Sequence, residues 1–262
     1  MTKLQWAAIG GTLGLFFVLY FGCDRKPEDI ASLEKSRALT VESTDINTVI
    51  KEAKAGLEAP QLSVVLSLEE ELEATVADSA RAEVYKELSS NWYELQHFAI
   101  AGSYAQEVAA LLNTENSWSI AGTTYSICMQ RAAEERIRDF CTGRAVQAFE
   151  NAISLNPENV ANKVNLALTY TTNPPPDNPM KGVLMLRELN QETPNNVLVL
   201  NALGRLSIRT GQYGNAVERL QAALQAEPGN VTSICLLAQA YEGSGDAKQA
   251  EHYADQCRRL RQ

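Results

Sequence analysis

Histidine is the scarcest residue of this 262-residue chain, which contains only His97 and His252. The five cysteines include no Cys-x-x-Cys pair, so the ligand spacing of a typical zinc site is absent. The sequence also lacks the nucleophile motif Gly-x-Ser-x-Gly and the glycine-rich motifs that bind nucleotide phosphates. His97 adjoins Phe98 on an expected helix, which indicates a packing role. We therefore expect a protein that is not an enzyme and holds no metal or cofactor.

Positive charge is also in short supply. The 32 acidic residues outnumber the 23 lysines and arginines and give a net charge of −9. An acidic protein repels nucleic-acid phosphates, and no basic stripe along the chain offsets this repulsion. We therefore expect no nucleic-acid partner.

One stretch lacks charge altogether. Residues 4–22 read LQWAAIGGTLGLFFVLYFG, in which only Gln5 and Thr12 are polar. About 20 such residues in a helix span a bilayer core, so residues 1–23 predict attachment to a membrane. Two interpretations stay open: an uncleaved signal-anchor helix, or a lipoprotein signal after which Cys23 becomes the acylated first residue. Tyr20 and Phe21 are bulkier than the residues that usually precede an acylated cysteine.

On either interpretation the remainder of the chain is a soluble domain held at a membrane. Lys3 favours an amino terminus on the inner side, whereas Arg25 and Lys26 favour the opposite orientation. Because such segments usually export the chain beyond them, we expect this domain in the periplasm, attached to a membrane of a bacterial cell envelope.

Two helical regions are expected after the membrane segment. Residues 24–61 are polar with scattered apolar residues, and they predict a partly helical stalk that ends at Pro60. Residues 62–90 predict one long amphipathic helix, because apolar side chains recur every four residues from Leu72 to Leu88.

The carboxyl-terminal part of the chain repeats itself with a period of 34 residues. Leu203-Gly204 recurs as Leu237-Ala238, and Ala216 recurs as Ala250. The pattern resembles the tetratricopeptide repeat, a pair of helices with small residues where the two approach closely. The resemblance implies an all-α fold, a helix-turn-helix superhelix of about four to five units over residues 91–262.

The expected units become less regular toward the amino terminus. They cover residues 118–159, 160–196, 197–230 and 231–262, after a degenerate unit at about 91–117 that starts at Trp92 and turns near Gly102. An insertion at about 128–142 lengthens the helices of the second unit or the turn between them. Four prolines between Thr171 and Pro179 predict a rigid loop in the third.

The resemblance also implies a function, namely a scaffold that binds a protein or peptide in a concave groove lined by the first helix of each unit. Side chains that the packing pattern leaves exposed on these helices are the candidates for the groove: Asn162, Asn165, Thr169, Asn201, Arg205, Gln239 and Glu242.

Four cysteines lie within the expected units. Cys128 and Cys141 bracket the insertion, and Cys235 and Cys257 lie on the two helices of the last unit. Each pair could form a disulfide in an oxidising compartment. The alternative is four small buried side chains.

The last unit is not followed by the polar capping helix that usually closes a repeat array. Its apolar side then needs cover, from a partner or from a second copy of the chain in a homodimer. The alternative is that Lys248, Glu251 and Arg258 make the last helix polar enough by themselves.

Overall fold

The computed structural model describes residues 45–261. The chain divides into two units, Met1–Ser43 and Thr44–Gln262, and all described residues belong to the second, which we call the body. The expected membrane segment at 1–23, with Cys23, and much of the stalk lie outside the described residues. No described helix is both long and apolar enough to cross a bilayer.

The body is built from helices, and its described residues contain no strand. The all-α fold expected from the sequence is therefore confirmed for residues 45–261. The helices are α3 (Ile46–Ala55), α4 (Ala59–Ala74), α5 (Asp78–Glu94), α6 (Phe98–Leu112), α7 (Glu115–Arg131), α8 (Glu135–Leu155), α9 (Val160–Thr172), α10 (Lys181–Glu192), α11 (Val197–Arg209), α12 (Tyr213–Ala226), α13 (Val231–Ser244) and α14 (Ala247–Leu260).

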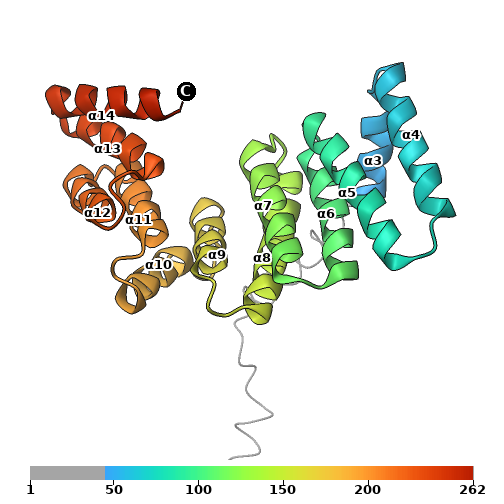
Figure 1. Ribbon diagram of the computed structural model, residues 1–262, viewed down its shortest axis with the longest axis horizontal. Coiled ribbons are helices and arrows are strands. Elements are labelled where there is room, and N and C mark those ends of the chain that lie inside the picture. The colour runs from blue at the N-terminus through green and yellow to red at the C-terminus, as the bar shows by residue number, and fades with distance from the viewer. Residues whose placement is uncertain (1–44, 262) are drawn as a thin grey trace, which may run out of the picture. The chain divides into compact units, whose positions relative to one another are not determined.

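From α5 onward the helices form five hairpins: α5–α6, α7–α8, α9–α10, α11–α12 and α13–α14. Each hairpin packs against the next along the chain (Figure 1). Such stacking buries the apolar faces that a single hairpin would leave exposed. On the first hairpin, α3 packs against α6 and α4 against α5, and together they enclose Trp92 and Ile100.

The region expected as one helix over residues 62–90 is two helices, α4 and α5. The break lies at Thr75, whose backbone is extended and whose hydroxyl donates to the carbonyl of Glu71 at 2.7 Å. A threonine that bonds its own backbone in this way competes with the helix. Pro60 does not end a helix either. It lies in the first turn of α4, where its missing N–H costs nothing.

The expected unit at 91–117 also differs from the structure, because Trp92 lies near the end of α5 and the turn falls at residues 95–97. Gly102 is inside α6. Leu88, Ser89 and Trp92 have the spacing of Leu237, Ala238 and Tyr241, so the hairpin starts well before Trp92. The Ser89 hydroxyl donates to the carbonyl of Ala101 at 2.9 Å, which brings α5 and α6 close at this small residue.

The other four hairpins begin at Glu115, Val160, Val197 and Val231. Asn159, Asn196 and Asn230 each cap a first helix, and their side chains accept backbone N–H groups of its first turn. Each of these asparagines lies two residues after a proline, where the preceding helix has ended. The insertion at 128–142 lengthens both helices of its hairpin, to 17 residues in α7 and 21 in α8.

Paired helices approach closely where the sequence supplies a glycine. A methyl group on Gly122 would lie 2.7 Å from the Phe149 ring, and one on Gly204 would lie 2.7 Å from the Leu220 side chain. At Gly182 the nearest atom is the backbone carbonyl oxygen of Ala167, only 2.3 Å from the added carbon. The contacts explain why the repeat requires small residues at these positions.

Two disulfides join helices within hairpins. Cys128 of α7 bonds to Cys141 of α8, with 5.9 Å between their Cα atoms, and Cys235 of α13 bonds to Cys257 of α14, with 5.0 Å. Closing loops of this length stabilises a fold by roughly 3 kcal/mol each. The second bridge matters for α14 in particular, because no residue of that helix is fully buried.

We predict opposite effects for alanine at two glycines. Gly182→Ala should destabilise the body by about 1–3 kcal/mol, because the backbone of α9 cannot yield to the new methyl group. Gly214→Ala should be neutral or stabilise by about 0.5 kcal/mol, because nothing lies within 4 Å and alanine favours the helix. Urea unfolding followed by circular dichroism measures both, and equal effects would contradict the close approach of α9 and α10.

Candidate functional site

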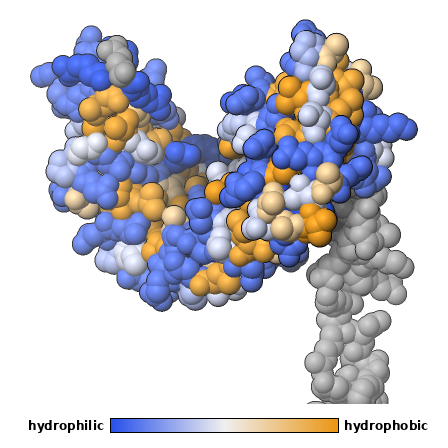
Figure 2. Space-filling view, turned by 45° about the vertical axis from the view of Figure 1, so that its right-hand side comes forward, coloured by the Kyte–Doolittle hydropathy of each residue, from blue (hydrophilic) through white to orange (hydrophobic). Residues whose placement is uncertain are grey.

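Hydrophobic residues on the visible face of the body form separate patches among hydrophilic ones (Figure 2). Exposed apolar side chains also lie on several helices, among them Leu66, Ile120 and Leu184. Scattered exposure of this kind is normal for a soluble domain. The exposed hydrophobic residues alone therefore do not identify a binding surface.

One face of α7 combines pockets with uncommitted polar groups. Its side chains Asn116, Ile120, Thr123, Ile127 and Gln130 recur every three or four residues, so they form a single stripe along the helix. The first two line a pocket on the side of α5 and α6, and the other three line a pocket on the side of α9 and α11. We call this stripe with its two pockets the α7 groove.

The pocket toward α9 and α11 has a volume of about 180 Å³. Hydroxyl and amide side chains from two helices line it, including Ser126, Asn165 and Thr172, beside the apolar Leu168. The exposed guanidinium of Arg205 completes the wall, and within the described residues it has no hydrogen-bond or ion-pair partner. The hydroxyls of Thr123 and Thr172 donate to carbonyls of their own helices, so the donors that stay without a partner among the described residues are the amides of Asn165 and Gln130 and the Arg205 guanidinium.

The pocket toward α5 and α6 is larger, with a volume of about 330 Å³. Ile120 and Leu112 line it with 52% and 39% of their surfaces exposed. Lys86 lies at its edge and pairs with Glu83 at 2.7 Å. Among the described residues that line the two pockets, none carries a carboxylate. In a chain with an excess of acid, the groove is therefore a surface without acidic side chains.

The structure does not bring the expected groove residues together. Asn165, Thr169 and Arg205 line the α7 groove. Gln239 and Glu242 are exposed on α13, away from both of its pockets, and Glu242 lines a different pocket on α13 and α14.

Asn162, Thr169 and Asn201 are buried rather than exposed. The Asn162 amide donates to Glu115 of α7, and the Thr169 hydroxyl donates to the carbonyl of Asn165. These three side chains were expected to be exposed because the repeat pattern leaves their positions on the first helices free of packing. Each is instead covered by the packing of neighbouring helices, where burial requires the hydrogen bonds that they make.

The Asn201 side chain connects two hairpins. Its amide nitrogen donates to Asn230 at 3.2 Å, and its carbonyl oxygen accepts from the hydroxyl of Ser233 at 2.7 Å. Because Asn230 also caps α13, this network fixes where α13 begins relative to α11. Asn201 is therefore a structural residue.

The polar side chains of α7 were not among the expected groove residues, although a signal for them exists in the sequence. Thr123 follows the small residue Gly122, just as Arg205 follows Gly204 and Gln239 follows Ala238. All three of these following residues are exposed. The position directly after the small residue of a first helix is therefore the signal for an exposed side chain, and in the second unit this position is Thr123.

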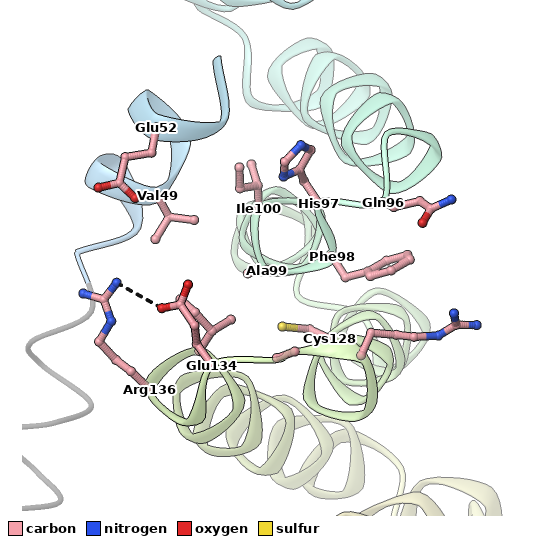
Figure 3. A pocket seen from close by; sticks show the side chains of 13 residues that line it. Val49, Glu52, Gln96, His97, Phe98, Ala99, Ile100, Cys128, Glu134 and Arg136 are labelled. Atoms are coloured by element: carbon pink, nitrogen blue, oxygen red, sulfur yellow. Dashed lines mark ion pairs between the residues drawn. The ribbon is translucent and has the colours of Figure 1, made fainter. Parts of the chain in front are cut away.

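A third pocket, of about 390 Å³, lies at the turns of the first two hairpins, where α3 forms one wall (Figure 3). Glu52 and the pair of Arg136 with Glu134, 3.8 Å apart, bring charges of both signs to it. Burial lowers the pKa of His97, so its imidazole is neutral at pH 7, and its ring contacts that of Trp92. The mixed charges favour no ligand class.

Nothing in these pockets indicates metal or nucleophilic chemistry. Cys128, which lines the third pocket, is bonded to Cys141. Across residues 45–261, no group of three histidine, cysteine, aspartate or glutamate side chains could hold a metal ion.

Comparison with known protein families finds a match in the last hairpins. Residues 207–259 match the family model described as tetratricopeptide repeat. This range runs from the end of α11 through α14, the regular part of the array in the sequence. No curated protein matches the chain.

Solved structures with similar folds share little sequence with this chain. PilW, a widely conserved type IV pilus biogenesis factor, is 17% identical, with 68% of this chain and 77% of that one covered and a TM-score of 0.48. MamA from Desulfovibrio magneticus RS-1 is 16% identical, with 69% and 94% covered and a TM-score of 0.43. YrrB, a tetratricopeptide repeat protein with an unusual peptide-binding site, is 14% identical, with 68% and 86% covered and a TM-score of 0.38.

We predict that two asparagines of the array differ in their effect on stability. Asn201→Ala should cost about 0.5–1.5 kcal/mol of unfolding free energy, because it removes the hydrogen bonds of the buried Asn201 amide with Ser233 and Asn230, while the Ser233 hydroxyl keeps Asn230 as an acceptor. Asn165→Ala should change it by less than about 0.5 kcal/mol, because the Asn165 amide is partly exposed. Urea unfolding of the two variants checks this, and a larger effect at Asn165 would show that the assignment is reversed.

Proposed function

We propose that this protein is a membrane-tethered scaffold of the cell envelope that binds a polypeptide partner in the α7 groove and catalyses no reaction. The observation that carries the proposal is the groove itself. Its Asn165 and Gln130 amides and the Arg205 guanidinium lie beside apolar side chains, and within the described residues they have no hydrogen-bond or ion-pair partner. Groups left unsatisfied at a surface are available to a ligand.

The dimensions of the groove suit a peptide segment. Its two pockets, of about 180 and 330 Å³, lie at successive positions along one helix face, so each can take one or a few side chains. Asn165 and Gln130 can donate to backbone carbonyls of an extended chain or to polar side chains of a helix. A groove of this lining therefore suits a polypeptide better than a small cofactor.

The charge of the groove restricts its ligand further. With Arg205 uncompensated and no carboxylate in either lining, the groove favours a segment that is neutral or acidic near Arg205. Basic segments would still be attracted by the net negative charge of the whole chain, but not to this surface.

Two features support an envelope location. Disulfides persist in oxidising compartments such as the periplasm, and the body carries two. The apolar run at residues 4–22 has the length and composition of a membrane segment. We propose that this run holds the body on the periplasmic side of a membrane.

A lipoprotein that serves as a structural subunit of an outer-membrane assembly is the second candidate. The observation that favours it is the pairing of the cysteines. Four of the five are joined within the body, so Cys23 has no cysteine partner left in its own chain. A cysteine directly after an apolar run is the position that acylation uses.

We predict that Arg205 controls partner binding. With a photo-crosslinking residue at Thr123 in native membranes, Arg205→Glu should reduce the yield of the main crosslinked product about tenfold or more, because a charge-assisted contact is worth about 1.5–3 kcal/mol. Mass spectrometry identifies the product and measures its yield.

Arg187→Glu is the matched control, since Arg187 is an exposed arginine of α10 that lines none of the pockets described. It should leave the yield unchanged. A crosslinker at exposed Glu150 of α8 should not capture the same product. If Arg205→Glu has no effect, or if Glu150 captures the product equally well, the groove assignment is wrong.

We predict that the mass of the mature protein shows whether the chain is held by a signal-anchor or by acyl chains on Cys23. A signal-anchor retains Met1–Gly22, whereas a lipoprotein has lost these residues and carries acyl chains on Cys23. Intact-mass analysis of protein extracted from membranes decides between them. Alkylation before reduction should leave Cys128, Cys141, Cys235 and Cys257 unmodified, and their modification would argue against an oxidising compartment.

A further inference from the structure

The outer side of the last hairpin is a surface that none of the helices α3 to α14 covers. Within residues 45–261 no helix packs there, and a pocket of about 360 Å³ opens between α13 and α14. The Cys235–Cys257 disulfide holds α14 against α13 and so fixes which face of α14 points outward. This outward face can therefore be defined residue by residue.

Small and charged side chains share this face of α14. Ala247, Ala250, Glu251 and Ala254 line the pocket, and Arg258, one turn beyond Ala254, continues the same stripe. We call the stripe from Ala247 to Arg258 the α14 face. Alanines let another helix approach closely, as they do inside the repeat array.

The charges of the α14 face are arranged so that it complements itself. Glu251 lies three residues before Ala254, and Arg258 lies four residues after it. When two such helices cross in opposite directions about a two-fold axis near Ala254, Glu251 of each copy meets Arg258 of the other, and the contact forms twice. A self-complementary patch of this kind is what an isologous dimer requires.

The charges remain available for such a contact. Arg258 pairs with Asp255 of its own helix, but both side chains are exposed, with 68% and 50% of their surfaces accessible. Exposed pairs of this kind contribute at most about 1 kcal/mol, so Arg258 can exchange its partner at little cost.

From this geometry we infer that the α14 face is a homodimer interface, in which two copies of the chain pack α14 against α14 in antiparallel orientation. The contact brings Ala250 and Ala254 of one copy against those of its partner, and it covers the pocket between α13 and α14. A helix of 14 residues is about 21 Å long, so the interface is small and the dimer dissociates at low concentration.

Charge reversal tests the inference. The dimer dissociation constant of the full chain in detergent is measured by sedimentation equilibrium over a range of concentrations. Glu251→Arg should raise it at least about tenfold, because the new arginine would face Arg258 of the second copy, and Arg258→Glu should do the same. The double variant should return it to within about threefold of the wild-type value, because the pair is restored with reversed signs.

Controls separate this contact from others. Glu218→Arg makes the same charge change on the exposed side of α12 and should leave the dissociation constant unchanged. A photo-crosslinking residue at Ala254 should give a covalent dimer, whereas one at exposed His252, on another side of α14, should not. Circular dichroism verifies that each variant keeps its helix content.

Three results would overturn the inference. The first is a wild-type chain that stays monomeric at every concentration. The second is a pair of single reversals without effect on the dimer. The third is a double variant that fails to restore it, because the charges would then not meet across a two-fold axis.

Discussion

The close contact of a glycine or other small residue with a large side chain of the paired helix is the constraint on which the array depends. The Phe149 ring lies against Gly122, and the Leu220 side chain lies against Gly204. Each contact sets the distance between the two helices of a hairpin and their rotation about their own axes. Once this rotation is set, each first helix packs one face against the second helix of its own hairpin and another face against the next hairpin. A third face is exposed to solvent.

The α7 groove is a consequence of this division. In α7 the residues packed against α6 and α8, such as Ala121 and Tyr125, are buried, whereas the stripe through Thr123 and Gln130 is exposed. The same division buries Asn162 and Asn201, which are polar but lie on the faces between hairpins. Their hydrogen bonds to Glu115 and Asn230 join neighbouring hairpins and fix how each hairpin is aligned with the next.

Each of the two disulfides joins the two helices of one hairpin. One joins α7 and α8, which extend beyond the usual repeat length because of the insertion at 128–142. The other joins α14, which has no fully buried residue, to α13. In the last hairpin the covalent bond supplements packing that reaches only one side of α14. The Cys128–Cys141 bond instead lies inside the core cluster that contains Tyr125 and Phe149.

The sequence alone determined the helices that have strong local signals. The period of 34 residues, the small residues at the helix contacts, and an asparagine two residues after each closing proline define the regular hairpins. These signals are local because capping, proline and close approach each act within one hairpin. Where such signals are absent the prediction was wrong, as in the placement of Trp92 and the unbroken helix at 62–90.

Only the tertiary structure decided which polar side chains are exposed. Asn162 and Asn165 are three residues apart on one helix, and yet the first is buried against Glu115 while the second lines the groove. Their local sequence cannot separate them, because burial depends on helices that come from distant parts of the chain. For the same reason the pairing of the four cysteines required the positions of the helices, which only the packing of complete hairpins supplies.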